Sequence, residues 1–159
     1  MDFEKKNITD LKESFSGMSK FTDEMKSEME RIEIKNRKDI EFLVRSFYNK
    51  VRKDELIGDF FNSVIGSEEN WENHFQKLTD FWQTNLLNEQ AYKGSPMQAH
   101  QKMDKETGNQ IEQEHFDRWL KLWKETVEEL YIGERADRAY SNAQNIATFM
   151  LLKMKMVRN

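Results

Sequence analysis

The chain has 159 residues, which is enough for one globular domain with a substantial core and too few for two domains of ordinary size. Charged residues make up 34% of the chain, and the formal net charge of -4 arises from interspersed acidic and basic residues, which gives no basic stripe for a nucleic acid. The absence of cysteine excludes disulfides, thiolate metal sites, iron-sulfur clusters and thioether-linked haem.

Residues 1-30 are highly charged and carry an interrupted helical pattern. Apolar residues recur three, four or seven positions apart, as in an amphipathic helix, but Gly17 interrupts them. We interpret the segment as an extension that is either partly disordered or a helix packed on the domain or on a second subunit. It has no apolar signal-peptide core, and the chain has no run of about 18 apolar residues, so we expect a cytoplasmic protein without a membrane partner.

The domain itself is expected over residues 31-159. From Asp39, a candidate N-cap, apolar residues follow the i, i+3, i+4, i+7 pattern of a helix, and Tyr48 lies on the inward stripe. A buried tyrosine either donates to a backbone carbonyl or directs its hydroxyl into a pocket, and both interpretations stay open. Two glycines then bound an aromatic corner that contains Phe60 and Phe61.

Residues 69-87 give the strongest helical pattern of the chain. Aromatic and aliphatic residues step by three and four along one face, and His74, Leu78 and Phe81 belong to this face. A histidine in such a position is either a hydrogen-bonded core residue or part of a cavity wall.

A short helix is predicted after the loop that follows. Ser95 is a candidate N-cap, Pro96 occupies the first helical position, and Gln98 completes a capping box. His100 lies three residues after Met97 and therefore on the same face of this helix. The pattern places a second imidazole on an apolar wall, as a candidate ligand or as a core residue.

Two further helices complete the predicted fold. Residues 104-113 are polar and indicate a surface loop, after which Trp119 lies on the buried stripe of a helix that ends near Gly133. The last helix runs from about Arg135 to the end, with basic residues such as Arg158 near its C-terminus that complement the helix dipole. Because no strand alternation occurs, the sequence predicts an all-α protein.

Four predicted helices thus direct a polar group inward: Tyr48, His74, His100 and Trp119. A neutral imidazole can hold a haem iron from one side. A diatomic ligand that gains negative charge on the other side is stabilised by O-H and N-H donors in a dry pocket. Tyr48, His74 and Trp119 are three such donors.

Four segments resemble, in order and spacing, the truncated haemoglobins of the third group: DIEFLVRSFYNKVRKDELIGDFFNSVIG, WENHFQKLTDFWQTNLL, YKGSPMQAH and HFDRWLKLWKETVEEL. The resemblance covers about residues 31-158. It implies a shortened helical globin sandwich that holds non-covalent haem b, with His100 as the iron ligand. It also implies that Phe61 packs on the haem, that Leu78 and Phe81 belong to the apolar wall, and that the ligand-binding residues are Tyr48, His74 and Trp119.

The function implied by the resemblance is reversible binding of oxygen, or of nitric oxide, carbon monoxide, cyanide or sulfide, at a pentacoordinate iron. Oxygen transport by a monomer is favoured over enzymatic activity, although nitric oxide dioxygenation or peroxide reduction with a reductase partner would use the same pocket. The loop at residues 104-113 is longer than usual in the group, and residues 1-30 have no counterpart. Lys93, Lys102 and Arg118 are candidate partners of the haem propionates.

Two other classes of protein stay open at this point. A non-haem di-iron protein would use the Glu112-x-x-His115 pair, but such a site needs a second pair and further glutamates, and His115 is expected to be exposed. A helical interaction module would need no cofactor, and its working part would be residues 1-30.

Overall fold

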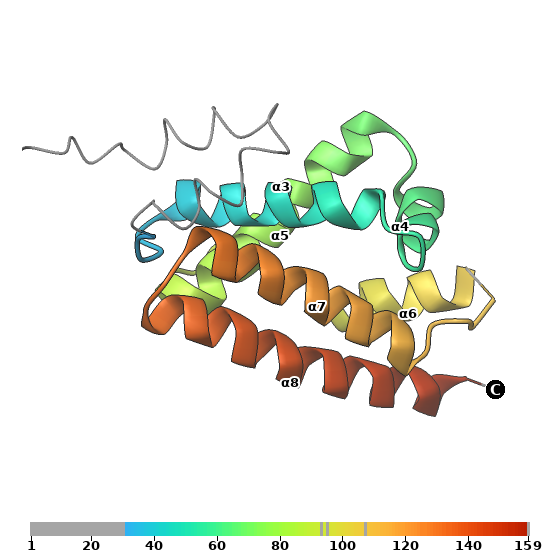
Figure 1. Cartoon of the computed structure of the whole chain (residues 1–159). Coiled ribbons are helices and arrows are strands. Elements are labelled where there is room, and N and C mark those ends of the chain that lie inside the picture. The colour runs from blue at the N-terminus through green and yellow to red at the C-terminus, as the bar shows by residue number, and fades with distance from the viewer. Residues whose placement is uncertain (1–30, 93, 95, 107, 159) are drawn as a thin grey trace, which may run out of the picture.

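The computed structural model describes residues 31-158 apart from residues 93, 95 and 107, and this part is helical with no strand (Figure 1). Its helices are α3 (Arg37–Arg52), α4 (Gly58–Ile65), α5 (Glu68–Leu87), α6 (Pro96–Glu106), α7 (Gln113–Leu130) and α8 (Glu134–Val157). The all-α prediction is confirmed. None of these helices is long and apolar enough to cross a membrane. The expectations for residues 1-30, for Lys93 and for the Ser95 cap lie outside the described residues.

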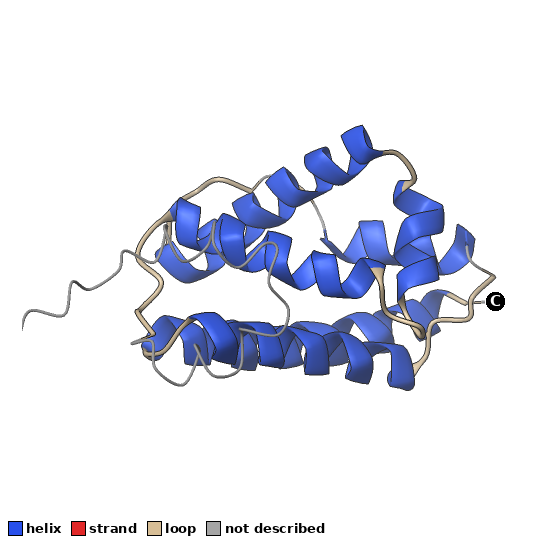
Figure 2. Cartoon of the chain, turned by 45° about the horizontal axis from the view of Figure 1, so that its top comes forward, coloured by secondary structure: helices blue, strands red, loops and turns tan. Residues whose placement is uncertain are grey.

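The helices pack in two layers, as Figures 1 and 2 show from two directions. Helices α3 and α5 pack on each other in one layer, and α7 and α8 form an antiparallel pair in the other. The layers meet where α3 packs on α7 and α5 packs on α8. The short helices α4 and α6 pack on each other, and α6 also packs on α8. This arrangement is the expected shortened helical sandwich.

Helix α3 begins before the predicted position. Its N-cap is Asn36, whose side chain accepts a hydrogen bond from the Asp39 backbone N-H at 3.1 Å. The prediction that Asp39 caps the helix was therefore wrong. Asp39 lies inside the first turn, and its carboxylate accepts from the Lys35 N-H at 2.9 Å. Tyr48 nevertheless faces inward as expected, with 4% of its surface exposed.

A cluster of aromatic side chains joins the two layers. The Trp123 indole on α7 stacks on the Trp82 ring of α5, with ring centroids 4.8 Å apart. Its Nε1 donates to the Ala139 carbonyl of α8 at 3.0 Å, so the buried N-H has a partner. Phe47 of α3 packs edge-on against Trp123 at 5.0 Å. These contacts fix α3, α5 and α8 relative to α7.

The segment at residues 104-113 is not only a surface loop. Helix α6 continues through Glu106, Asp104 is 2% exposed, and Ile111 is 3% exposed. The prediction was wrong here because the polar composition of the segment hid a buried carboxylate. Gly133 does not end α7 directly but is the N-cap of α8, with a φ of 99° that side chains rarely adopt.

Tyr131 connects the end of α7 to the start of α3, because its buried hydroxyl donates to the Asp39 carbonyl at 2.7 Å. We predict that Tyr131→Phe lowers the free energy of unfolding by about 1-2 kcal/mol, since the buried hydrogen bond from the Tyr131 hydroxyl to the Asp39 carbonyl is lost. Urea unfolding of the purified protein, followed by circular dichroism, measures the change. Tyr140→Phe is the matched control, because the hydrogen bond that the Tyr140 hydroxyl accepts from Gln144 is exposed. Equal effects of the two substitutions would contradict the prediction.

Candidate functional site

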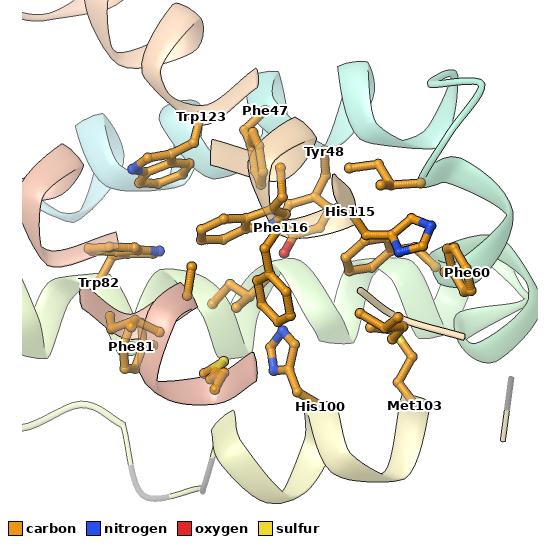
Figure 3. Close-up of a pocket in the computed structure, with 18 residues that line it drawn as sticks. Phe47, Tyr48, Phe60, Phe81, Trp82, His100, Met103, His115, Phe116 and Trp123 are labelled. Atoms are coloured by element: carbon orange, nitrogen blue, oxygen red, sulfur yellow. The ribbon is translucent and has the colours of Figure 1, made fainter. Parts of the chain in front are cut away.

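A pocket lies between the two layers and the short helices α4 and α6. Its empty volume, including the open mouth, is about 760 Å³. The lining consists mainly of aromatic and aliphatic side chains, with contributions from every described helix (Figure 3). Such a lining suits a large, mostly apolar ligand whose orientation is fixed by a few polar groups.

His100 enters this pocket from α6. Figure 3 shows its imidazole on one side of the pocket, while Tyr48 extends from α3 on the opposite side. Met103, three residues after His100, lines the same side and is 9% exposed. The three-residue spacing along α6 therefore places His100 and Met103 on one face of the helix.

His115 also lines the pocket, although exposure was expected. Only 12% of its side chain is exposed, and its ring packs edge-on against Phe60 with centroids 4.8 Å apart. Its Nδ1 accepts the Glu112 N-H at 2.8 Å, which completes the N-terminal cap of α7. The exposure prediction failed because a cap residue can turn back over its own helix end. His115 is thus committed to the helix cap through Nδ1.

Tyr48 supplies a hydroxyl inside the pocket. Its ring packs edge-on against Phe61 at 5.7 Å and against His74 at 5.1 Å. Burial raises the pKa of the Tyr48 phenol above its usual value of 10.0, so the group remains protonated and can donate. Trp119 lies close enough to that hydroxyl to offset part of the rise in pKa. No acceptor in the described structure meets hydrogen-bond geometry at the Trp119 indole N-H.

His74 lies beside Tyr48 but is not among the residues that line the pocket. Its Nε2 is buried and has no hydrogen-bond partner within the described part of the chain. Burial, with smaller contributions from the charges of His100 and Lys77, lowers the pKa of His74 to about 4. The imidazole is therefore neutral near pH 7 and carries one N-H that it can donate.

The expected apolar residues Phe61, Leu78 and Phe81 all line the pocket. Sequence reasoning did not single out several other lining residues, because periodicity marks a residue as buried without saying whether it faces a cavity. These residues are Phe47, Ile57, Trp82, Met103, Ile111, His115, Phe116, Ile146, Ala147 and Met150.

The cationic candidates differ in their surroundings. Arg118 donates to the Asp54 carboxylate at 2.8 Å, whereas the Lys102 side chain is 75% exposed near Glu106. No group of three histidine or carboxylate side chains that could hold a metal ion occurs among the described residues. The di-iron alternative therefore finds no support there. His100 instead faces Tyr48 across an apolar pocket, and an imidazole in such a setting fits haem, whose iron can take a histidine ligand.

Comparisons with known proteins identify relatives of the chain. Residues 32-156 match the sequence model of the family described as bacterial-like globin. A group 3 truncated haemoglobin of Campylobacter jejuni is 37% identical over 119 residues, which span 74% of this chain and 90% of that protein. The crystal structure of a group III truncated haemoglobin from Campylobacter jejuni matches with a TM-score of 0.69 and 34% identity, over 82% of this chain and 97% of that chain.

The lowered pKa of His74 predicts a pH dependence of stability. A histidine titrates near 6.5 when unfolded and here near 4 when folded, so the unfolded state binds more protons between these values. The contribution of His74 to the free energy of unfolding is therefore fully present above pH 6.5 and is lost as the pH falls towards 4. We predict that protonation of His74 lowers the free energy of unfolding of the haem-free protein by up to about 2 kcal/mol at pH 5, relative to its value above pH 6.5.

Urea titrations of wild type and His74→Leu at pH 8 and pH 5 measure this contribution. The wild-type protein is expected to lose more stability than the variant between the two pH values. An equal loss in both proteins would show that His74 does not titrate differently on folding.

Proposed function

Because the chain belongs to the bacterial-like globin family, as a truncated haemoglobin of group 3, we propose that it binds oxygen or another diatomic ligand reversibly at a pentacoordinate haem b. Membership of the family makes it a haem-binding globin. The observation that carries the finer proposal is the position of His100 on one side of the pocket with Tyr48 on the opposite side (Figure 3).

Bound haem would supply an iron atom that can hold a diatomic molecule. His100 would hold the iron through one imidazole nitrogen. The apolar side chains Phe61, Leu78 and Phe81 would contact the porphyrin and bury its surface, which favours non-covalent retention.

On the opposite side, Tyr48 and Trp119 would orient the diatomic ligand. The Tyr48 hydroxyl stays protonated and donates, and the Trp119 N-H lies beside it without a regular acceptor in the described chain. Neutral His74 supplies a third N-H next to the Tyr48 ring. Each donor stabilises a ligand that carries partial negative charge by roughly 1-3 kcal/mol.

The apolar lining excludes water and strengthens these hydrogen bonds. A donor in a medium of low dielectric interacts more strongly with a charged acceptor than a donor in water does. Phe47 and Phe61 pack edge-on against the Tyr48 ring at 4.8 and 5.7 Å, so the hydroxyl is held in place rather than free to rotate away. The pocket therefore favours slow release of a ligand that accepts hydrogen bonds over one that does not.

We predict that Tyr48→Phe raises the oxygen dissociation rate constant by roughly tenfold or more, because one donor is lost while the ring remains. Stopped-flow displacement of oxygen by carbon monoxide measures the rate constant. Tyr140→Phe, outside the pocket, is the control. An unchanged rate constant in Tyr48→Phe would remove Tyr48 from the proposed ligand site.

The iron ligand is tested with His100→Ala. We predict that the variant loses the spectrum of histidine-ligated haem and that added imidazole restores it, because a free imidazole fits the space left by the side chain. Absorption spectra of the ferric and ferrous protein, with and without imidazole, measure both effects. His115→Ala serves as the control, since it removes the other histidine that lines the pocket. A wild-type spectrum in His100→Ala would overturn the assignment.

A further inference from the structure

An ion pair joins the C-terminal end of the chain to the helix that carries His100. Arg158 follows α8, and its guanidinium group binds both carboxylate oxygens of Asp104 on α6. Nε donates to Oδ2 at 2.9 Å, and the terminal nitrogen donates to Oδ1 at 2.7 Å. Asp104 is 2% exposed, so the carboxylate charge is buried with its partner. This bidentate geometry fixes the direction as well as the distance of the contact.

The same guanidinium group holds two further positions near the pocket. It donates to the Glu112 carboxylate at 2.8 Å and to the Ile111 carbonyl. The Ile111 N-H in turn donates to Oδ1 of Asp104 at 3.2 Å. Arg158 therefore ties together the end of α6, the connection to α7 and the N-cap residue of α7.

Asp104 and His100 lie four residues apart on α6 and therefore on the same face of the helix. Helix α6 has only 11 residues, so one fixed point near its end restricts its rotation about its own axis. A small rotation of the helix would move the imidazole sideways in the pocket. A loss of the ion pair would also leave the Asp104 carboxylate buried without its cation, which favours movement of the helix end towards water.

We propose that Arg158 is a positioning residue for His100: by holding Asp104, it sets the orientation in which the imidazole meets the haem iron. The inference rests on the proposed function, in which His100 is the iron ligand. It assigns to Arg158, which caps the C-terminal end of α8, a role that helix-dipole stabilisation alone does not include.

The test uses full-length haem-loaded protein with Arg158→Gln. Two quantities are measured: the rate of haemin transfer to excess apomyoglobin, and the iron-imidazole stretching band in the resonance Raman spectrum of the ferrous, unligated protein. We expect haemin loss to accelerate on the order of tenfold, as for other residues that orient a metal ligand. We also expect the Raman band to shift or broaden relative to wild type.

Three further variants, Lys155→Gln, Arg158→Lys and Asp104→Asn, separate the positioning of the imidazole from a general loss of stability or charge. Lys155→Gln is the matched control, because Lys155 binds Glu112 at 2.9 Å and its removal takes one charge from the same turn while Asp104 stays paired. Its haemin loss and Raman band are expected to match wild type. Arg158→Lys keeps the positive charge but lacks the bidentate geometry of a guanidinium group. Its rate of haemin loss and its Raman band are therefore expected to lie between those of wild type and of Arg158→Gln.

Asp104→Asn removes the other half of the ion pair and provides the test if Arg158→Gln does not fold. Asp104→Asn should reproduce the Raman change of Arg158→Gln. The double variant that combines Arg158→Gln with Asp104→Asn should lose haemin no faster than either single variant. An unchanged band and an unchanged rate in either foldable variant would overturn the inference. Absence of an iron-imidazole band in wild type would instead overturn the proposed function, so the two failures are distinguishable.

Discussion

A polar hydrogen that is buried without an acceptor destabilises a folded protein by about 1-3 kcal/mol, and the rest of this site depends on that constraint. Within the part of the chain that the structure describes, Trp119 Nε1 and His74 Nε2 are both buried without a partner. His74 packs edge-on against the Tyr48 ring, and Trp119 lies close to the Tyr48 hydroxyl, whose pKa is raised by burial so that it stays protonated. Trp119 lines the largely aromatic pocket, whereas His74 packs against the Tyr48 ring outside that lining, so we propose a ligand in the pocket as the acceptor for the Trp119 N-H.

The polar side chains around Tyr48 and the His100 imidazole come from different helices. Tyr48, His74 and Trp119 come from α3, α5 and α7, which the aromatic cluster around Trp123 holds together. His100 comes from α6, which packs on α4 and α8 rather than within the two main layers. At one end of the connection to α6, the Thr84 hydroxyl accepts the backbone N-H groups of residues 91 and 92. The arrangement therefore places the three polar side chains on helices of the two main layers and His100 on a helix that is anchored separately.

Most of the fold follows from the spacing of apolar residues, because a helix repeats every 3.6 residues and its buried face shows in the sequence. That spacing also predicts the inward positions of Tyr48 and His100. The cap at Asn36, the burial of Asp104 and the position of His115 could not be predicted in this way. Each depends on a polar side chain whose partner is distant in sequence or on the other side of a helix end. The roles of His100 and Tyr48 towards haem came from the resemblance to truncated haemoglobins, since periodicity shows only that they face inward.

The infrared spectrum of the carbon monoxide complex of the wild-type protein tests the central claim most directly. The C-O stretching frequency falls when hydrogen-bond donors face the ligand, because their positive field draws electron density towards its oxygen. If Tyr48 and its neighbours direct their polar hydrogens to the ligand, the band will lie clearly below that of haem-bound carbon monoxide in an apolar solvent. A band at the apolar-solvent position would mean that the donors do not reach the ligand, and the account of the pocket would be wrong.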